Sequence, residues 1–342
     1  MRSRTLIQLV CAHAEGEIGK VVVGGLLDLP GESALDKLLW LRREGEELRR
    51  FLTFEPRGQP QASVNLVLPS RVPEAHGVFL VLQPDGVHAM SGSNAICTTT
   101  VLLETGMVAM REPESEVVLD TAAGLVRARA RCCGGRCESV ELAMPASFVD
   151  AEGVELDVDG IGRVVIDVAF GGVFYALLDP ERVGLSIAPE RARELVDVGM
   201  RVLAEAKRRL TPRHPERPEL AGLAYLMFAG WDRDGPVNAT IMPPGRIDRS
   251  PCGTGSSARL ALMFQRGQVR EGETVVFRSI IQSRFVARIA GTLEVGGRPA
   301  VRPVLSGRAW IYGREEILCD PEDPFRGGHL LSDVWGPGIG ER

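Results

Sequence analysis

The 342-residue sequence has few aromatic residues, no long hydrophobic run and no excess of positive charge. Without an apolar stretch of about 18 residues, no segment qualifies as a membrane-spanning helix. The N-terminus also lacks the apolar core and cleavage site of a signal peptide, so we expect a cytoplasmic protein with no membrane partner. The net charge is −5, so we expect no basic surface for nucleic acid.

The seven cysteines fit a reducing compartment better than a disulfide framework, because their number is odd. Three of them, Cys132, Cys133 and Cys137, lie close together in RCCGGRC. A structural zinc site takes four ligands, usually in two spaced pairs, and no second pair stands nearby. We therefore predict a strand–turn–strand with the two glycines at the turn, and no metal. Cys11 and Cys319 lie in apolar, strand-like runs and are predicted to be packing residues.

The order of elements indicates a duplicated chain. Most of it reads as short strands broken by Gly, Pro and Asp, with long helices predicted at 34–51 and 189–210. Two apolar helices are predicted to begin just after Gly92 and Gly253. We predict two similar domains, residues 1–180 and residues 181–319, with 320–342 as a segment that completes the first. A small ligand is expected in the cleft between them.

The second glycine-rich loop, DRSPCGTGSSAR, spans Asp248 to Arg259 and places Cys252 where a strand turns into a helix. The free amides of Gly253, Thr254 and the following glycine are expected to bind an anion at the helix N-terminus. The same position is expected to lower the pKa of the thiol and make Cys252 a base.

The first loop, MSGSN, matches the second by position: Ser91 corresponds to Cys252 and Ser93 to Thr254. Two helix N-termini with a side chain on either face of an α-carbon suit proton removal and return at that carbon. A nucleotide P-loop needs a lysine that is missing here. A hydrolase needs a histidine base; His88 is close in sequence but is expected on the incoming strand, and no G-x-S-x-G motif exists. Cys97 is predicted to be a core residue.

DRSPCGTG with the following SAR resembles the second catalytic motif of the proline racemase family. HAEGEIGKVVVGG (13–25), PRG (56–58), FGGVFYAL (170–177) and DPEDPFRGG (320–328) are similar to other segments of that family. The resemblance implies an α/β (α+β) fold of two pseudo-symmetric halves of the diaminopimelate epimerase type. Each half would be a strand-rich, barrel-like sheet around a central helix, with the active site between the halves and no cofactor.

The resemblance also implies roles for the loop residues. Ser91 and Cys252 would flank the α-carbon, and Asp248 would hold the cationic ring nitrogen. Tyr225 would contact the ring. The substrate carboxylate would be bound by Gly92, Ser93, Gly253 and Thr254.

The chain departs from the family pattern in its first loop, where racemases and epimerases resemble MCGHG. Ser91 replaces a thiol there, and a serine hydroxyl is a poor base for a carbon acid. We therefore expect a lyase that dehydrates trans-3-hydroxy-L-proline to Δ1-pyrroline-2-carboxylate. Epimerisation of 4-hydroxyproline, or racemisation of proline, is the alternative, and a non-catalytic imino-acid binding protein is a third. The expected partner is hydroxyproline or proline, with a homodimer as a candidate assembly.

Overall fold

The computed structural model describes residues 5–331, which fall into two compact units. Within them, unit 1 comprises residues 5–142 and 307–331, and unit 2 comprises residues 143–306. The domain boundary expected at 180 falls inside unit 2, because the strands of 147–178 pair with one another and with the strand at 223–232. Residues 309–319, expected in the second half, pair with the first strand of unit 1. Residues 332–342 of the expected completing segment lie outside the described residues.

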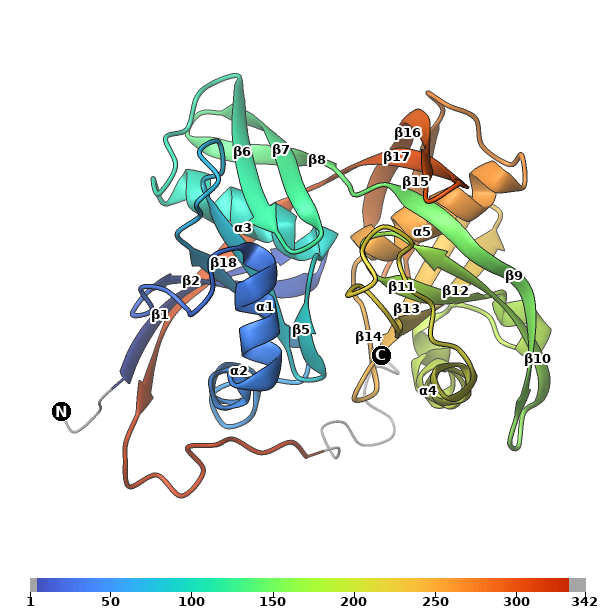
Figure 1. Cartoon of the computed structure of the whole chain (residues 1–342), viewed down its shortest axis with the longest axis horizontal. Coiled ribbons are helices and arrows are strands. Elements are labelled where there is room, and N and C mark those ends of the chain that lie inside the picture. The colour runs from blue at the N-terminus through green and yellow to red at the C-terminus, as the bar shows by residue number, and fades with distance from the viewer. Residues whose placement is uncertain (1–4, 332–342) are drawn as a thin grey trace. The chain divides into compact units, whose positions relative to one another are not determined.

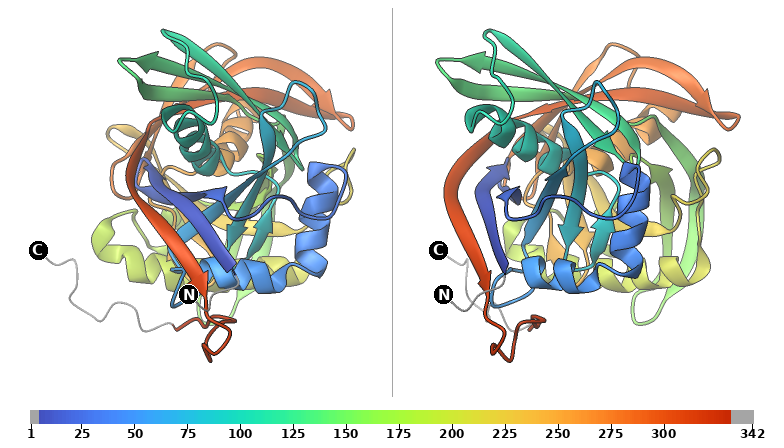
Figure 2. Two further views of the ribbon diagram at one scale, coloured as in Figure 1. Left: turned by 90° about the vertical axis from the view of Figure 1, so that its left-hand side faces the viewer. Right: turned by 60° about the vertical axis from the view of Figure 1, so that its left-hand side comes forward.

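Unit 1 is built on one sheet in the order β18–β1–β2–β3–β4–β6–β7–β8, with β5 on β4. Only the β2–β3 and β4–β6 pairs are parallel. The blue β1 and the red β18 run side by side in Figure 2. The strands are β1 (Thr5–Ala14), β2 (Glu17–Gly24), β3 (Ala62–Leu68), β4 (Gly77–Gln83), β5 (Gly86–His88), β6 (Glu114–Thr121), β7 (Gly124–Cys133), β8 (Arg136–Ala143) and β18 (Ala309–Cys319).

Unit 2 repeats this pairing in the order β9–β10–β11–β12–β13–β15–β16–β17, with β14 on β13. Its parallel pairs, β11–β12 and β13–β15, occupy the positions that β2–β3 and β4–β6 occupy in unit 1. Strand β17 also pairs with β9, so this sheet closes on itself. The repeat confirms the strand-rich, two-halved α/β fold. The strands are β9 (Ser147–Val158), β10 (Gly162–Phe170), β11 (Phe174–Leu178), β12 (Leu223–Asp232), β13 (Gly235–Met242), β14 (Arg246–Ile247), β15 (Thr274–Ser279), β16 (Arg284–Val295) and β17 (Arg298–Gly307).

One helix lies among the strands of each unit: α3 (Gly92–Glu104) in unit 1 and α5 (Gly253–Gln265) in unit 2 (Figure 1). Every residue of α3 up to Leu103, and of α5 up to Met263, is buried. Their sequences suit this position because they carry small or apolar residues on all sides rather than on one face. Helix α3 packs on β1, β2 and β18, and α5 on β9, β10 and β16. The predicted starts at the two glycine loops are confirmed.

The outer helices are amphipathic and cover the sheets from outside. Residues 34–51 form two helices rather than the expected one, α1 (Ala34–Arg43) and α2 (Glu46–Thr53). They separate at Gly45, where a Cβ atom would lie 2.7 Å from Leu41 Cα, so the chain turns tightly against α1. In unit 2, the 3₁₀ turn η1 (Pro180–Val183) precedes a second 3₁₀ turn, η2 (Pro189–Arg191), which leads into α4 (Ala192–Arg209).

The predicted cysteine hairpin is confirmed between β7 and β8. Gly134 and Gly135 form its turn with φ values of 59° and 73°, as a two-residue hairpin of this kind requires. Cys132 lies opposite Cys137 on the buried face, whereas Cys133 is exposed on the other. The three thiols therefore do not converge on one point. Within residues 5–331, no helix is both long and apolar enough to span a membrane.

Candidate active site

Cys252 occupies the turn between β14 and α5, directly before the first helical residue. Its φ of 66° and ψ of 107° are unusual for a residue other than glycine and cost of order 1–3 kcal/mol. The turn is held by its own side chains. Cys252 N donates to Ser250 Oγ (3.1 Å), and both Ser250 N and Ser250 Oγ donate to Asp248 Oδ1 at 2.8 Å. Asp248 therefore orders the turn that carries the thiol.

A second set of hydrogen bonds ties this turn to strand β13. Asn238 Nδ2 donates to the Pro251 carbonyl (2.9 Å) and to Ser256 Oγ (3.0 Å). Ser256 Oγ in turn donates to the same carbonyl at 2.9 Å. The residue before Cys252 is thereby fixed from the sheet and from the helix at once, which offsets the unfavourable backbone conformation.

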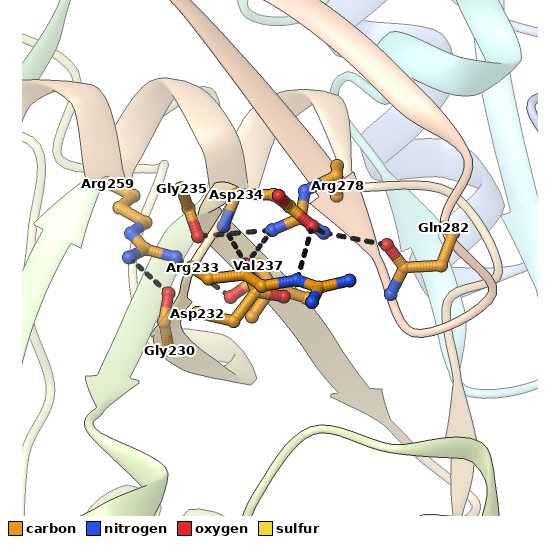
Figure 3. A network of polar contacts seen from close by, with 9 residues as sticks. All are labelled: Gly230, Asp232, Arg233, Asp234, Gly235, Val237, Arg259, Arg278 and Gln282. Atoms are coloured by element: carbon orange, nitrogen blue, oxygen red, sulfur yellow. Dashed lines mark hydrogen bonds and ion pairs between the residues drawn. The ribbon is translucent and has the colours of Figure 1, made fainter.

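Arg259, on α5, holds the Asn238 side chain in place. Its guanidinium donates to Asn238 Oδ1 at 2.6 Å. It also donates to the carbonyls of Val237 (2.9 Å) and Gly230 (2.7 Å), which Figure 3 shows. Burial lowers the pKa of Arg259 to about 9, with the Asp179 carboxylate acting in the opposite direction. The side chain is therefore a buried cation at neutral pH, satisfied largely by neutral oxygens.

A second buried arginine, Arg278 on β15, lies beside this group in Figure 3. It forms an ion pair with Asp232 and donates to Gln282 Oε1 at 2.8 Å. It also donates to the Gly235 carbonyl (3.3 Å), at the turn between β12 and β13. Arg278 thus fixes the far end of the two strands that Arg259 anchors to α5.

The thiol itself contacts a tyrosine that sequence reasoning did not single out. Tyr175 Oη lies 3.2 Å from Cys252 Sγ and 2.6 Å from Thr254 Oγ1. All three side chains are buried, and Tyr175 is fully enclosed. Tyr175 belongs to the FGGVFYAL segment, which was matched to the family as a segment without a role for this residue. A tyrosine placed by strand β11, 77 residues before Cys252, gives no local signal of this contact.

Two glycines allow this close packing. A Cβ atom on Gly255 would lie 2.3 Å from Met227 Cε and 3.1 Å from Cys252 Sγ. A Cβ atom on Gly171 would lie 2.0 Å from the Thr254 carbonyl oxygen, so only glycine lets the end of β10 approach the first turn of α5.

The expected lowering of the Cys252 pKa is wrong for the protein without substrate. Burial, the largest cause, raises the pKa of Cys252 to about 12, and the Asp248 carboxylate raises it further. The Tyr175 hydroxyl and the Gly255 amide act in the opposite direction and do not outweigh burial. The thiol is therefore protonated at neutral pH.

Ser91 occupies the corresponding turn in unit 1, with φ −150° and ψ 125° before α3. Its hydroxyl makes no capping hydrogen bond to the helix backbone. Instead, Asn94 Nδ2 donates to Ser91 Oγ at 2.8 Å, and Ser93 Oγ lies 3.4 Å away. Asn65 Nδ2, from β3, donates to Asn94 Oδ1 at 2.9 Å and so orients the amide. Sequence reasoning missed both asparagines.

Strand β2 passes closely over this turn. A Cβ atom on Gly19 would lie 2.7 Å from Asn94 Oδ1 and 3.1 Å from Cys97 Sγ. Cys97 is fully buried, and that burial raises its pKa well above the usual range. The prediction that Cys97 is a core residue is confirmed. His88, considered as a partner of Ser91, instead places its Nε2 3.2 Å from Asp85 Oδ2.

The structure therefore gathers the sequence-predicted residues into two groups, one in each unit. Ser91, Gly92 and Ser93 share the turn before α3. In unit 2, Asp248, Cys252, Gly253 and Thr254 share the turn before α5, and Tyr225 lies in the same buried cluster as Cys252. The rings of Tyr225 and Tyr175 are 5.7 Å apart.

Comparison with known proteins gives a consistent result over nearly the whole chain. The family model described as proline racemase matches residues 9–330. A 4-hydroxyproline 2-epimerase of Agrobacterium fabrum is 49% identical over 343 residues, which cover 99% of each chain. A crystal structure of a hydroxyproline epimerase from Agrobacterium vitis, with bound trans-4-hydroxy-L-proline, matches with a TM-score of 0.95 at 48% identity. That match covers 98% of this chain and 99% of the other.

A probable proline racemase from Agrobacterium radiobacter K84, solved with bound carbonate, matches with a TM-score of 0.94 and 49% identity. It covers 98% of this chain and 100% of that protein. Together these proteins overturn the expected dehydration of trans-3-hydroxy-L-proline: the relatives are named for epimerisation or racemisation, not for elimination. The expectation of dehydration rested on the replacement of a thiol by Ser91, whose contacts with Asn94 and Ser93 are not visible in the sequence.

Proposed function

Because the chain belongs to the proline racemase family, we propose that it epimerises 4-hydroxyproline at the α-carbon. The observation that carries the proposal is the buried Cys252 thiol at the N-terminus of α5, in a chain 49% identical over its length to a protein named for this reaction. A binding protein would have no use for a thiol held in a strained turn by so many hydrogen bonds.

The proposal gives Cys252 and Ser91 the two proton transfers. Cys252, as a thiolate, takes the α-proton, so that the Cα–H bond breaks and an S–H bond forms. The Ser91 hydroxyl returns a proton to the opposite face of the carbon. The Asn94 amide, which donates to Ser91 Oγ at 2.8 Å, supports this role because it stabilises the oxygen as negative charge develops there. In the reverse direction the two groups exchange roles.

Helix N-termini supply donors for the substrate carboxylate. Neither Ser91 nor Cys252 caps its helix through the side chain, and the first amides of α3 and α5 suit a carboxylate. We assign this role to Gly92 and Ser93 in one turn, and to Gly253 and Thr254 in the other.

A bound imino acid also changes the acidity of the thiol. Its ring nitrogen is a cation, and a positive charge near Cys252 stabilises the thiolate and lowers the pKa that burial has raised. Asp248 is the anion we assign to that nitrogen, and Tyr225 is assigned to the ring. Substrate binding would then activate the base, which is otherwise protonated.

The test is incubation of the purified protein with trans-4-hydroxy-L-proline in deuterated water, followed by NMR spectroscopy and chiral chromatography. We expect cis-4-hydroxy-D-proline with one deuterium at Cα, and a final mixture of both epimers. Proline and trans-3-hydroxy-L-proline serve as parallel substrates. Unchanged 4-hydroxyproline, with bound ligand detected by calorimetry, would replace the epimerase proposal by an imino-acid binding protein.

A further inference from the structure

The hydroxyls of Tyr175 and Thr254 form a short chain that ends at the Cys252 sulfur. Tyr175 Oη is 2.6 Å from Thr254 Oγ1 and 3.2 Å from Cys252 Sγ. Each hydroxyl carries one hydrogen and can both donate and accept. The two hydrogen bonds can therefore point either toward or away from the Cys252 sulfur without any heavy atom moving.

The two directions correspond to the two protonation states of the thiol. With Cys252 as a thiolate, Tyr175 donates to the sulfur and Thr254 donates to Tyr175. With Cys252 as a thiol, the S–H can donate to Tyr175, and Tyr175 donates to Thr254. Hydrogen bonds to a charged acceptor are about twice as strong as neutral ones, so the first direction favours the thiolate.

We propose that Tyr175 is a positioning residue for epimerisation, whose hydroxyl reverses its hydrogen bond between Cys252 and Thr254 each time Cys252 changes between thiolate and thiol. This inference rests on the proposed function and deepens it. Epimerisation requires such tolerance because Cys252 must be a base in one direction and an acid in the other. A fixed donor would serve only one of them.

Few other groups near the thiol could both donate a hydrogen bond to the sulfur and accept one from it. Asp248 is the charged group that faces it, and its carboxylate acts against the thiolate. Tyr225 is the other titratable side chain of the buried cluster, which is otherwise formed by apolar residues of β9 to β13 and α5. The Gly255 amide also lowers the pKa of the thiol, but a backbone amide can only donate, and the buried Thr240 hydroxyl has no hydrogen-bond partner among the described residues.

The first measurement is the pH dependence of kcat in both directions, since kcat reports groups in the enzyme–substrate complex. Tyr175→Phe removes the hydroxyl and keeps the ring. In the direction where Cys252 is the base, we expect the pH of half-maximal kcat to rise by about one unit, a tenfold loss of thiolate. In the opposite direction, where Cys252 is the acid, the pH at which kcat falls to half its maximum should also rise. Thr254→Val should shift both values the same way by less.

Tyr312→Phe is the matched control, because Tyr312 is on β18 in unit 1 and about half exposed. It should leave both pH values unchanged. A Tyr175→Phe enzyme with lower kcat but unshifted pH values in both directions would mean that Tyr175 only fills space, and would overturn the proposal.

A second measurement needs no turnover: the rate at which iodoacetamide alkylates Cys252 at fixed pH, followed by mass spectrometry of its peptide. A rise of one pKa unit lowers the thiolate fraction tenfold but makes the thiolate about threefold more nucleophilic, so we expect roughly a threefold slower reaction in Tyr175→Phe. An unchanged or faster rate contradicts the hydrogen-bond chain. A slower rate in a protein that does not epimerise 4-hydroxyproline would support the chain and refute the proposed function.

Discussion

Arg259 Nη1 donates a 2.6 Å hydrogen bond to Asn238 Oδ1 in the interior of unit 2, and Asn238 in turn holds the carbonyl before Cys252. A buried cation on α5 thus determines the conformation of the turn at that helix's own beginning. This relationship explains how Cys252 keeps a positive φ that an isolated turn of this sequence would avoid.

Arg259→Met should lower the free energy of unfolding by roughly 2–4 kcal/mol, because three oxygen acceptors lose an ionised donor in the interior. Urea unfolding followed by circular dichroism measures this change. Arg233→Met is the control, since the Arg233 side chain is 92% exposed and should leave the midpoint where it is. Equal midpoints for the two variants would show that the network has little energetic weight.

Cys252→Ala should abolish both epimerisation and exchange of the α-proton with solvent, while the unfolding midpoint stays near that of the unmodified protein. The reason is that alanine keeps the Cβ atom but has no group that accepts a proton. Chiral chromatography and NMR in deuterated water measure the two activities. The exposed Cys133, changed to alanine, provides the matched control with full activity. Substantial turnover in Cys252→Ala would assign the thiol to packing.

Ser91→Ala should separate exchange from inversion. From the epimer whose α-proton faces Cys252, the variant should still exchange that proton with solvent, because the thiol can remove and return it on one face. Inversion should fall by at least about a hundredfold, the usual contribution of a positioned acid or base. NMR in deuterated water distinguishes the two results. Inversion at the original rate would mean that another group protonates the second face.

Asp248→Asn should weaken substrate binding by roughly ten- to a hundredfold, because a charge-assisted hydrogen bond to the ring nitrogen contributes about 1.5–3 kcal/mol. The amide oxygen can still accept from Ser250, so the turn should persist. Calorimetric titration with 4-hydroxyproline measures the affinity. Unchanged affinity with a lower melting temperature would restrict Asp248 to ordering the turn.

The same variant has a predictable effect on pH dependence. The Asp248 carboxylate raises the pKa of the Cys252 thiol, so its removal lowers that pKa. In the direction where Cys252 acts as the base, the rise of kcat with pH should therefore occur at lower pH in Asp248→Asn. This shift is opposite in sign to the one expected for Tyr175→Phe, and the two variants check each other.

Local sequence was sufficient for the elements that depend on local chemistry. Gly92 and Gly253 mark the starts of α3 and α5. Both helices carry small or apolar residues on all sides, which indicates that they are buried. The paired glycines of RCCGGRC define a hairpin turn because both need a positive φ. The repeated order of strands and helices also revealed the two halves, although the boundaries expected at 180 and 319 differ from those of the two compact units.

Only the tertiary structure decided which residues far apart in the chain contact one another. The Tyr175–Cys252 contact spans 77 residues, and the bond from Asn65 that orients Asn94 beside Ser91 spans 29. The direction in which the Cys252 pKa shifts could not be predicted from the sequence either. A helix N-terminus favours the thiolate, but burial among strands β9 to β13 and helix α5 favours the thiol more. Burial depends on how the whole unit closes around a residue, and no local pattern encodes its extent. The sequence therefore determined that Ser91 and Cys252 stand directly before two buried helices, and the tertiary structure determined their hydrogen-bond partners and the protonation of Cys252.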